Sequence, residues 1–232
     1  MPDSVVVLSG GLDSAVNLKC ALDTGRVLRA LTFDYGQRAA PRECFVSRAM
    51  CRRYRISHEV IRLPWFRRIT HTALVDRTRA IPHPSFAALD KPGQTDRLAA
   101  RVWVPNRNGL FLAVAAAFAE GLSADQVVTG FNAEEARSFP DNSEEFVALY
   151  NKTLKLSTRS GVRVRSYTSH MRKTSIIALG LVLHAPMDLS WSCYEGGPKL
   201  CGCCESCRRF LRAVRLSGAG DWFKANYPFW PR

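Results

Sequence analysis

Short runs of aliphatic and β-branched residues alternate in the first part of this chain with amphipathic segments of helical length. In order, the pattern predicts a strand at 5–8, a helix at 15–23, a strand at 27–33, a helix at 41–54 and a strand at 57–63. This alternation is typical of a parallel sheet with helices on both faces, because each helix carries the chain back to begin the next strand in the same direction. We therefore predict a Rossmann-like fold of the α/β class.

The remainder of the chain continues this pattern and then departs from it. Residues 109–120 are apolar on nearly all sides, which indicates a helix buried against the sheet, and 126–129 supply another strand. Residues 70–102 are rich in Pro, Thr, Asp and Arg without a steady period, so we expect a mobile insert over the active site. We predict an α/β domain at 1–185 and a C-terminal module at 186–232 that ends in aromatic residues. These are Trp222, Phe223, Tyr227, Phe229 and Trp230.

Composition excludes a membrane protein and leaves the charge open to two interpretations. No apolar run approaches the ~18 residues of a membrane span, and no signal segment precedes the first strand, so we expect a cytoplasmic protein with no membrane partner. The net charge is +13, and Arg supplies 26 of the 33 basic residues. This excess either attracts anions such as ATP or RNA, or reflects a codon usage that favours Arg.

The run Ser9-Gly10-Gly11-Leu12-Asp13-Ser14 lies between the first strand and the first helix. Two glycines allow a sharp turn, the serines add hydroxyl donors, and the unpaired N–H groups at a helix N-terminus favour anions. An ordinary turn capped by Ser and Asp is the alternative. The order of strand, glycines, acid and hydroxyl resembles the adenine nucleotide alpha-hydrolase-like superfamily, in which an SGGxDS loop holds the pyrophosphate released when ATP adenylates a substrate. Asp13 would then bind the Mg²⁺ that accompanies ATP.

Five cysteines lie close together near the C-terminus. Cys204-x-x-Cys207 has the spacing of a zinc knuckle, Cys201 repeats it, and Cys193 closes a set of four from a separate segment. Cys203 is next to a ligand in sequence, and we expect its side chain to point away. Four thiolates around Zn²⁺ leave no open position, so the site is predicted to be structural; a redox pair is the alternative. The single thiols Cys20, Cys44 and Cys51 are expected in the core.

Five motifs, taken in order, resemble the 7-cyano-7-deazaguanine synthase family. They are SGGLDS, FDYGQR at 33–38, VPNRNGLFLA at 104–113, Lys173-Thr174 before a helix, and the cysteine motifs WSCY and CGCCESC. The resemblance implies an ATP-dependent ligase that turns 7-carboxy-7-deazaguanine and ammonia into the nitrile, through acyl-adenylate and amide-adenylate intermediates, on the way to queuosine or archaeosine. ATP, Mg²⁺ and structural Zn²⁺ are the implied cofactors, and we expect a homodimer.

The resemblance also implies which residues bind ATP. We expect Arg107 and Lys173 to add positive charge, although an Arg paired across helices and a surface Lys are the alternatives. Tyr35 and Gln37 would flank the adenine, unless they are ordinary turn residues. The expected nucleotide-binding set is Leu8, Ser9, Gly10, Gly11, Leu12, Asp13, Ser14, Tyr35, Gln37, Arg107, Asn108 and Lys173.

The stretch 138–143 departs from the pattern common in this family, with Ser-Phe-Pro-Asp-Asn-Ser in place of Gly-Tyr-Pro-Asp-Cys-Arg. Here Phe139 would stack on the deazapurine, and Asp141 or Glu135 would accept hydrogen bonds from its amino and ring N–H groups. Asn142 completes the expected substrate-binding set. Alternatively, residues 141–143 cap a helix at 144–156.

Three other functions remain open from the sequence. A conjugating relative would join the adenylated deazaguanine to another amine, such as the N-terminus of a partner protein. A tRNA thiolase would need a free cysteine near the phosphate loop. A zinc-stabilised RNA-binding module would fit the basic charge, although no aromatic and basic RNA motif is present.

Overall fold

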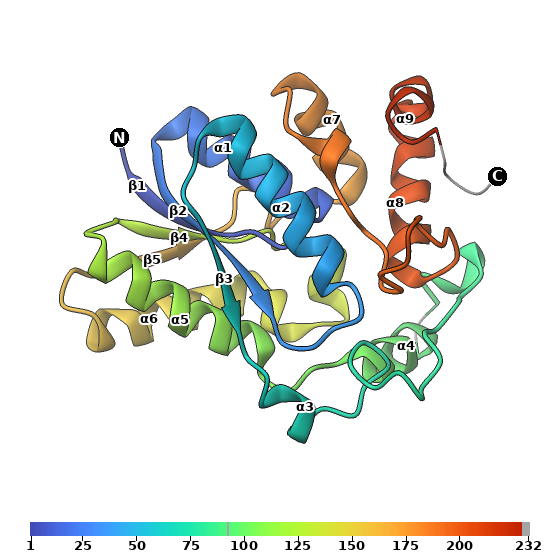
Figure 1. Ribbon diagram of the computed structural model, residues 1–232, viewed down its shortest axis with the longest axis horizontal. Coiled ribbons are helices and arrows are strands. Elements are labelled where there is room, and N and C mark those ends of the chain that lie inside the picture. The colour runs from blue at the N-terminus through green and yellow to red at the C-terminus, as the bar shows by residue number, and fades with distance from the viewer. Residues whose placement is uncertain (92, 229–232) are drawn as a thin grey trace.

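A five-stranded parallel sheet forms the centre of this protein, as the computed structural model shows (Figure 1). The structure describes residues 1–91 and 93–228, so Pro92 and the predicted tail residues Phe229 and Trp230 lie outside the described residues. The strands are β1 (Asp3–Val7), β2 (Arg26–Asp34), β3 (His58–Arg62), β4 (Gln126–Val128) and β5 (Arg163–Arg165), in the spatial order β3-β2-β1-β4-β5. All neighbouring pairs are parallel. The predicted α/β class is therefore confirmed.

Helices cover both faces of this sheet (Figure 1). α1 (Leu12–Thr24), α2 (Ala40–Tyr54) and α7 (Lys173–Val182) lie on one face, and α5 (Arg107–Gly121) and α6 (Glu144–Ser157) lie on the other. The buried side chains of α5 include those of Leu112, Ala115 and Ala119, which recur every three to four residues and place one side of the helix against the sheet.

The strand order reverses direction between β1 and β4. From β1 the chain runs outward to β2 and β3, whereas β4 and β5 extend the sheet on the other side. Loops that leave two such adjacent strands diverge to opposite faces and leave a crevice at their carboxyl ends, which is where ligands bind in open sheets. The SGGLDS loop follows β1 at this point.

Besides the helices α3 (Phe66–Ile69), α8 (Glu205–Leu216) and α9 (Gly220–Asn226), which the sequence did not predict, β5 and α4 differ from the prediction. β5 was not predicted, because only Val164 of its three residues is buried and the flanking arginines are exposed, so it lacks a strand-like pattern. The insert at 70–102 was expected to be irregular, but its end forms α4 (Gln94–Val102), in which Ala99 and Val102 are buried one turn apart. The polar and charged residues of α4 interrupt the apolar pattern, so the sequence did not predict this helix. Whether the insert moves remains a prediction.

The C-terminal residues form a small helical unit beside α7. It contains α8 (Glu205–Leu216) and α9 (Gly220–Asn226), and α8 packs against α7. Phe210, Ala213 and Val214 of α8 are buried in a cluster with Ile176 and Ile177 of α7. A short helix, α3 (Phe66–Ile69), precedes the insert. Of the single thiols predicted in the core, Cys20 and Cys51 are buried and Cys44 is half-buried.

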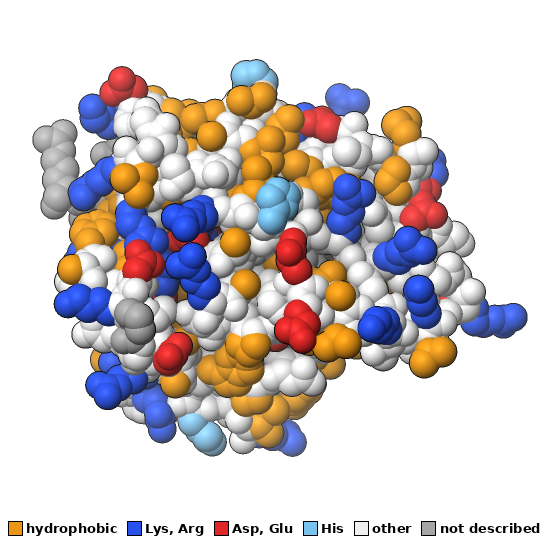
Figure 2. All heavy atoms as spheres, turned by 180° about the vertical axis from the view of Figure 1, so that it is seen from behind, with side chains coloured by type: hydrophobic (Ala, Val, Ile, Leu, Met, Phe, Trp, Pro, Cys, Tyr) orange, Lys and Arg blue, Asp and Glu red, His pale blue; other side chains and the backbone are white. Residues whose placement is uncertain are grey.

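Figure 2 shows one face of the surface. Lys and Arg side chains gather towards its two sides, and hydrophobic, Asp and Glu side chains lie between them. The net charge of +13 is therefore not concentrated in one continuous patch on this face. Within residues 1–91 and 93–228, no helix has the length and apolar character needed to cross a membrane.

Candidate active site

A cavity of about 230 Å³ lies beyond the carboxyl ends of β1, β2 and β4. Most of the predicted nucleotide- and substrate-binding residues line it, and they come from segments far apart in the sequence. These residues are Leu8, Ser9, Gly11, Leu12, Asp13, Ser14, Tyr35, Gln37, Arg107, Asn108, Glu135, Phe139, Asn142 and Lys173. Gly10 and Asp141 are not among the lining residues.

The SGGLDS loop brings hydroxyl groups and the N-terminus of α1 to one side of this cavity. Ser9 Oγ lies 3.1 Å from Ser14 Oγ and accepts a hydrogen bond from Gly11 N at 3.3 Å. Gly11 is the N-cap residue of α1 and has no side chain with which to cap this helix. The first N–H groups of α1 are therefore open to an anion, which the positive end of the helix dipole also favours.

Two glycines allow this loop to pack tightly. Gly10 has φ of +75°, and a Cβ atom there would lie 2.4 Å from Val46 Cγ2 of α2. At Gly130, which follows β4, a Cβ would lie 2.7 Å from Ser14 N. Both distances are too short for any side chain. Gly10 therefore supports the loop from behind, which explains why it does not line the cavity.

Lys173 lies between two carboxylates at the base of the cavity. It is the first residue of α7, and its Nζ donates to Asp13 Oδ2 at 2.6 Å and lies 2.8 Å from Glu135 Oε1. Only 7% of the Lys173 side chain is exposed. Arg107 is likewise the first residue of α5, so both predicted cations begin helices that face the cavity.

Burial and charge act in opposite directions on these groups. Burial lowers the pKa of Lys173, but the charges of Asp13 and Glu135 outweigh it and hold that pKa above its usual value. Burial raises the pKa of Asp13 against the opposing effect of Lys173, and the second carboxylate, Glu135, raises it further. Lys173 therefore stays protonated at neutral pH and pairs with both carboxylates.

Tyr35, which directly follows β2, and Arg107 form a hydrogen-bonded pair in the lining of the cavity. Arg107 Nη1 donates to Tyr35 Oη at 3.1 Å. The Gln37 amide is used within its own turn, since its Oε1 accepts from Tyr35 N at 2.9 Å and its Nε2 donates to Phe33 O at 2.9 Å. Gln37 therefore braces the turn that presents Tyr35, and its role beside the adenine stays a prediction.

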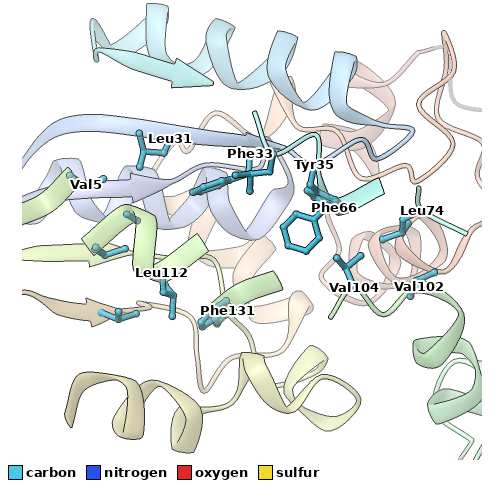
Figure 3. Close-up of a cluster of buried hydrophobic side chains, with 14 of the residues drawn as sticks. Val5, Leu31, Phe33, Tyr35, Phe66, Leu74, Val102, Val104, Leu112 and Phe131 are labelled. Atoms are coloured by element: carbon cyan, nitrogen blue, oxygen red, sulfur yellow. The ribbon is translucent and has the colours of Figure 1, made fainter. Parts of the chain in front are cut away.

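An apolar wall completes the cavity. Figure 3 shows Phe33, Tyr35 and Phe66 near the end of the sheet, with Leu74 and Val102 of the insert facing them. Phe33, Tyr35, Leu74 and Val102 also line the cavity. Apolar side chains thus anchor the insert to the site.

Phe139 contributes an aromatic face to the cavity. Its ring is nearly parallel to that of Trp103, with an interplanar angle of 6° and a centroid distance of 6.1 Å. Aromatic rings held in this way offer a flat apolar surface to a planar heterocycle.

Several buried polar atoms at the cavity find no hydrogen-bond partner within the described part of the chain. They are Asp13 Oδ1, Thr129 Oγ1, Asn142 Oδ1 and Ser192 Oγ. Buried polar groups are almost always paired in native proteins, so a set that faces one cavity indicates a polar ligand there. A carboxylate oxygen such as Asp13 Oδ1 is also a suitable Mg²⁺ ligand.

The loop at 138–143 caps α6 and also lines the cavity, while its binding of substrate stays a prediction. Ser143 is the N-cap residue of α6, and its side chain accepts from Phe146 N at 3.0 Å. Asn142 instead faces the cavity, and its Nδ2 lies 3.5 Å from Glu135 Oε2. Asp141 accepts from Asn108 Nδ2 through its backbone carbonyl. The cap therefore falls on Ser143 alone.

Glu43 is a half-buried acid of the cavity that sequence analysis did not identify. It lies in the first turn of α2, where an acid usually stabilises the helix end at the surface, so its position gave no signal. In the fold, Gln37 Nε2 donates to Glu43 Oε2 at 2.7 Å. Burial raises the pKa of Glu43 to about 7, although the hydrogen bond from Gln37 lowers it.

Replacing Glu43 with Gln should flatten the pH dependence of stability. Because the folded-state pKa of Glu43 is raised, the native chain holds this proton to higher pH than the unfolded chain, and stability is lost as pH rises from about 4.5 to about 7. The amide side chain of the Glu43→Gln variant cannot ionise and keeps an acceptor for Gln37. We expect the free energy of unfolding of the variant, relative to that of the original chain, to be higher at pH 8 than at pH 5 by on the order of 2 kcal/mol. Denaturant unfolding at both values measures it, and an equal difference at both would contradict the assignment.

Four buried or half-buried thiols form a cluster near the start of α8. The Sγ atoms of Cys193, Cys201, Cys204 and Cys207 all lie within 4.8 Å of one another, and those of Cys201 and Cys207 are 3.9 Å apart. Two thiolates on one tetrahedral Zn²⁺ would be about 3.8 Å apart. Backbone N–H groups of Cys201 and Cys204 point at the sulfur atoms of Cys193 and Cys201, each at 3.3 Å. The predicted four residues are brought together and could hold a metal ion.

Cys203 lies outside this set of four but close to it. Its Sγ is within 4.8 Å of Cys201 Sγ and of a ring nitrogen of His83 in the insert. The side chain therefore faces the insert instead of the centre of the four thiols.

Comparison with known proteins identifies relatives along nearly the whole chain. The model of the family described as queuosine biosynthesis protein QueC matches residues 3–218. A 7-cyano-7-deazaguanine synthase of Pelotomaculum thermopropionicum is 53% identical over 215 residues, which cover 93% of this chain and 97% of that protein. Proteins of the same name from Desulforamulus reducens and Methanosarcina mazei are 50% and 42% identical, covering 93% and 94% of this chain and 95% and 96% of theirs.

Proposed function

This chain belongs to the queuosine biosynthesis protein QueC family, and on that premise we propose that it converts 7-carboxy-7-deazaguanine and ammonia to 7-cyano-7-deazaguanine with ATP. The observation that carries the proposal is the SGGLDS loop, which opens at the N-terminus of α1 on the same cavity as Lys173. A loop of hydroxyl and N–H donors beside a buried cation suits the pyrophosphate part of ATP.

The reaction needs two activations. A carboxylate is a poor electrophile, so its oxygen first attacks the α-phosphorus of ATP, and pyrophosphate leaves. Ammonia then attacks the acyl carbon, AMP leaves with the acyl oxygen, and an amide results. The amide oxygen attacks a second ATP, and loss of that oxygen with AMP, together with two protons from nitrogen, gives the nitrile. Each nitrile therefore costs two ATP.

The residues around the loop have distinct parts in this proposal. Ser9, Ser14 and the first N–H groups of α1 would hold the departing pyrophosphate, and Lys173 would balance its charge. Mg²⁺, when bound at Asp13 Oδ1, would neutralise phosphate oxygens. Tyr35 and the turn that Gln37 braces would face the adenine.

The substrate ring is proposed to lie between the loop at 135–142 and the apolar wall. Phe139 would stack on the deazapurine, and Glu135 and Asn142 Oδ1 would accept from its N–H groups. Support comes from the position of all three at the cavity and from the unpartnered Asn142 Oδ1 among the described residues. Asp141, also predicted here, would act through its carbonyl contact with Asn108.

We propose that the four thiols bind structural Zn²⁺. Four thiolates complete a tetrahedral zinc ion and leave no position for substrate. The ion would join the 193 segment to the start of α8 within the module at 186–232, and α8 packs against α7 of the α/β domain at 1–185. The homodimer and the cytoplasmic location remain predictions.

The other functions find less support. No cysteine of the described chain lines the cavity, so no thiol is placed to carry sulfur for a thiolase. An RNA-binding module without catalysis would not need a phosphate loop that opens on a buried cation. Conjugation to another amine would use the same adenylation site, but the relatives described above are named 7-cyano-7-deazaguanine synthases.

Product analysis distinguishes the nitrile synthase from a conjugating enzyme. With ATP, 7-carboxy-7-deazaguanine and saturating ammonium, we expect the nitrile by mass spectrometry and two AMP per nitrile, because both oxygen atoms must leave as part of AMP. A product that stops at the amide, with one AMP, or that appears only on the amine of an added protein, would contradict the proposal.

A further inference from the structure

The carboxylate of Glu134 joins two helices that are distant in sequence. Its Oε1 accepts a hydrogen bond from the backbone N of Lys173 at 3.0 Å, and its Oε2 accepts from Arg212 Nη2 at 2.9 Å. Only 13% of the Glu134 side chain is exposed. One acid therefore connects the first residue of α7 to the middle of α8.

The N-terminus of α7 depends on this acid. Arg172, the N-cap residue, makes no side-chain capping hydrogen bond, so Glu134 supplies an acceptor and a negative charge that the helix does not provide for itself. The same residue whose N–H is held in this way, Lys173, extends its ammonium group to Asp13 and Glu135 in the cavity. A shift of Glu134 would therefore move the Lys173 backbone and its ammonium group.

Arg212 holds Glu134 with a forked contact. Its Nη2 donates to Glu134, and its Nη1 donates to the carboxylate of Asp90 in the insert. One turn earlier on α8, Arg209 donates to Leu89 O and to Glu205 Oε1, each at 3.0 Å, and its Nη1 lies 3.7 Å from Glu134 Oε2, farther than Arg212. A guanidinium group holds two acceptors in a rigid planar geometry, whereas the three donors of an ammonium group rotate freely.

The helix that carries Arg212 begins at the thiol cluster. Cys204 is the N-cap residue of α8, and Cys207 lies in its first turn. The position of α8, and with it that of Arg212, is thus fixed at one end by the four thiols.

We propose that Glu134 and Arg212 are positioning residues for Lys173. Through these two residues, helix α8, which begins at the four thiols, would hold the Lys173 ammonium group at the edge of the cavity proposed to bind phosphate. The inference rests on the proposed function, because it takes Lys173 to face the phosphates of ATP. It gives the cysteine module a second part in the enzyme besides joining segments of the fold.

The first test compares two arginines of α8. Arg212→Ala should lower kcat for substrate-dependent ATP–pyrophosphate exchange about tenfold, with the KM for ATP changed less than about twofold, because a displaced Lys173 chiefly weakens the transition state. Arg215→Ala is the matched control, since Arg215 lies on the same helix and contacts the Phe86 ring at 5.1 Å. Zinc content should match in both. Equal kcat in the two variants would overturn the proposal.

A double variant tests whether Arg212 acts through Glu134. The amide of the Glu134→Gln variant has one acceptor oxygen and cannot serve both the Lys173 N–H and Arg212, so this change alone should also lower kcat. Arg212→Ala should then add less than about twofold in the Glu134→Gln background, because coupled residues are not additive. A full tenfold further loss would show that Arg212 acts by another route and would overturn the proposal.

Hydrogen exchange provides a test that needs no substrate. In Arg212→Ala, the backbone amides of 173–176 should exchange at least about fivefold faster than in Arg215→Ala, because Glu134, the acceptor of the Lys173 N–H, loses its hydrogen bond at 2.9 Å and keeps only the Arg209 ion pair at 3.7 Å. If the amides exchange faster in Arg212→Ala but the original protein shows no ATP–pyrophosphate exchange, the proposed function is refuted and the positioning role stands. Unchanged amide exchange would refute the positioning role itself.

Discussion

Replacing Cys204 with Ser should release the metal and unfold much of the C-terminal module. Cys204 is fully buried at the N-cap of α8 and contributes one of four clustered thiols. Serine cannot replace a thiolate, and folding energy from a structural zinc site is lost with the ion. We expect zinc to fall from about one per chain to near zero, with a loss on the order of 4 kcal/mol in the free energy of unfolding.

Metal analysis of the purified protein and denaturant unfolding measure this result. Cys203→Ser is the matched control, since it makes the same change one residue away at a thiol outside the set of four. It should keep the metal and nearly all of the stability. If Cys203→Ser released the ion while Cys204→Ser retained it, the assignment of the four ligands would be wrong.

Replacing Asp13 with Asn should abolish adenylation while preserving the fold. Asp13 follows the two glycines of the loop, and its Oδ1 is the carboxylate oxygen proposed to bind Mg²⁺. An amide oxygen carries no charge to hold the ion, so we expect ATP–pyrophosphate exchange to fall about 1000-fold. Glu135 still lies 2.8 Å from Lys173 Nζ, so the buried cation keeps a carboxylate partner and the chain should remain folded.

The control for the exchange assay is the Asp23→Asn variant. Asp23 lies on the same helix, α1, and pairs with Lys19 at the surface, so this control makes the same chemical change away from the cavity. Its exchange rate should equal that of the original chain. Retention of more than about a tenth of the rate in Asp13→Asn, with the control unaffected, would remove Asp13 from the site.

Local sequence was sufficient for the elements that carry a strong period. β1 is recognised by a continuous apolar run and β2 by a mostly apolar one, and α2 begins and ends within one residue of its predicted bounds. β5 and α4 were missed for one reason, which is that each buries only one or two apolar side chains among charged neighbours. Their conformation is stabilised by strand pairing with β4 and by packing against the core, and neither contact leaves a local pattern.

The sequence by itself determined the α/β class, the SGGLDS turn before the first helix and the four clustered cysteines, because each depends on a periodic pattern, one short segment or a fixed spacing. Only the tertiary structure decided which charges meet at the cavity. Lys173 and Asp13 are 160 residues apart, and Arg212 and Glu134 are 78 apart, yet each pair is in direct contact. Glu43 has the sequence context of a surface acid and becomes half-buried at the cavity only when α2 packs beside the loop. Such contacts follow from how helices and loops converge at the carboxyl ends of the strands, and no local periodicity encodes that convergence.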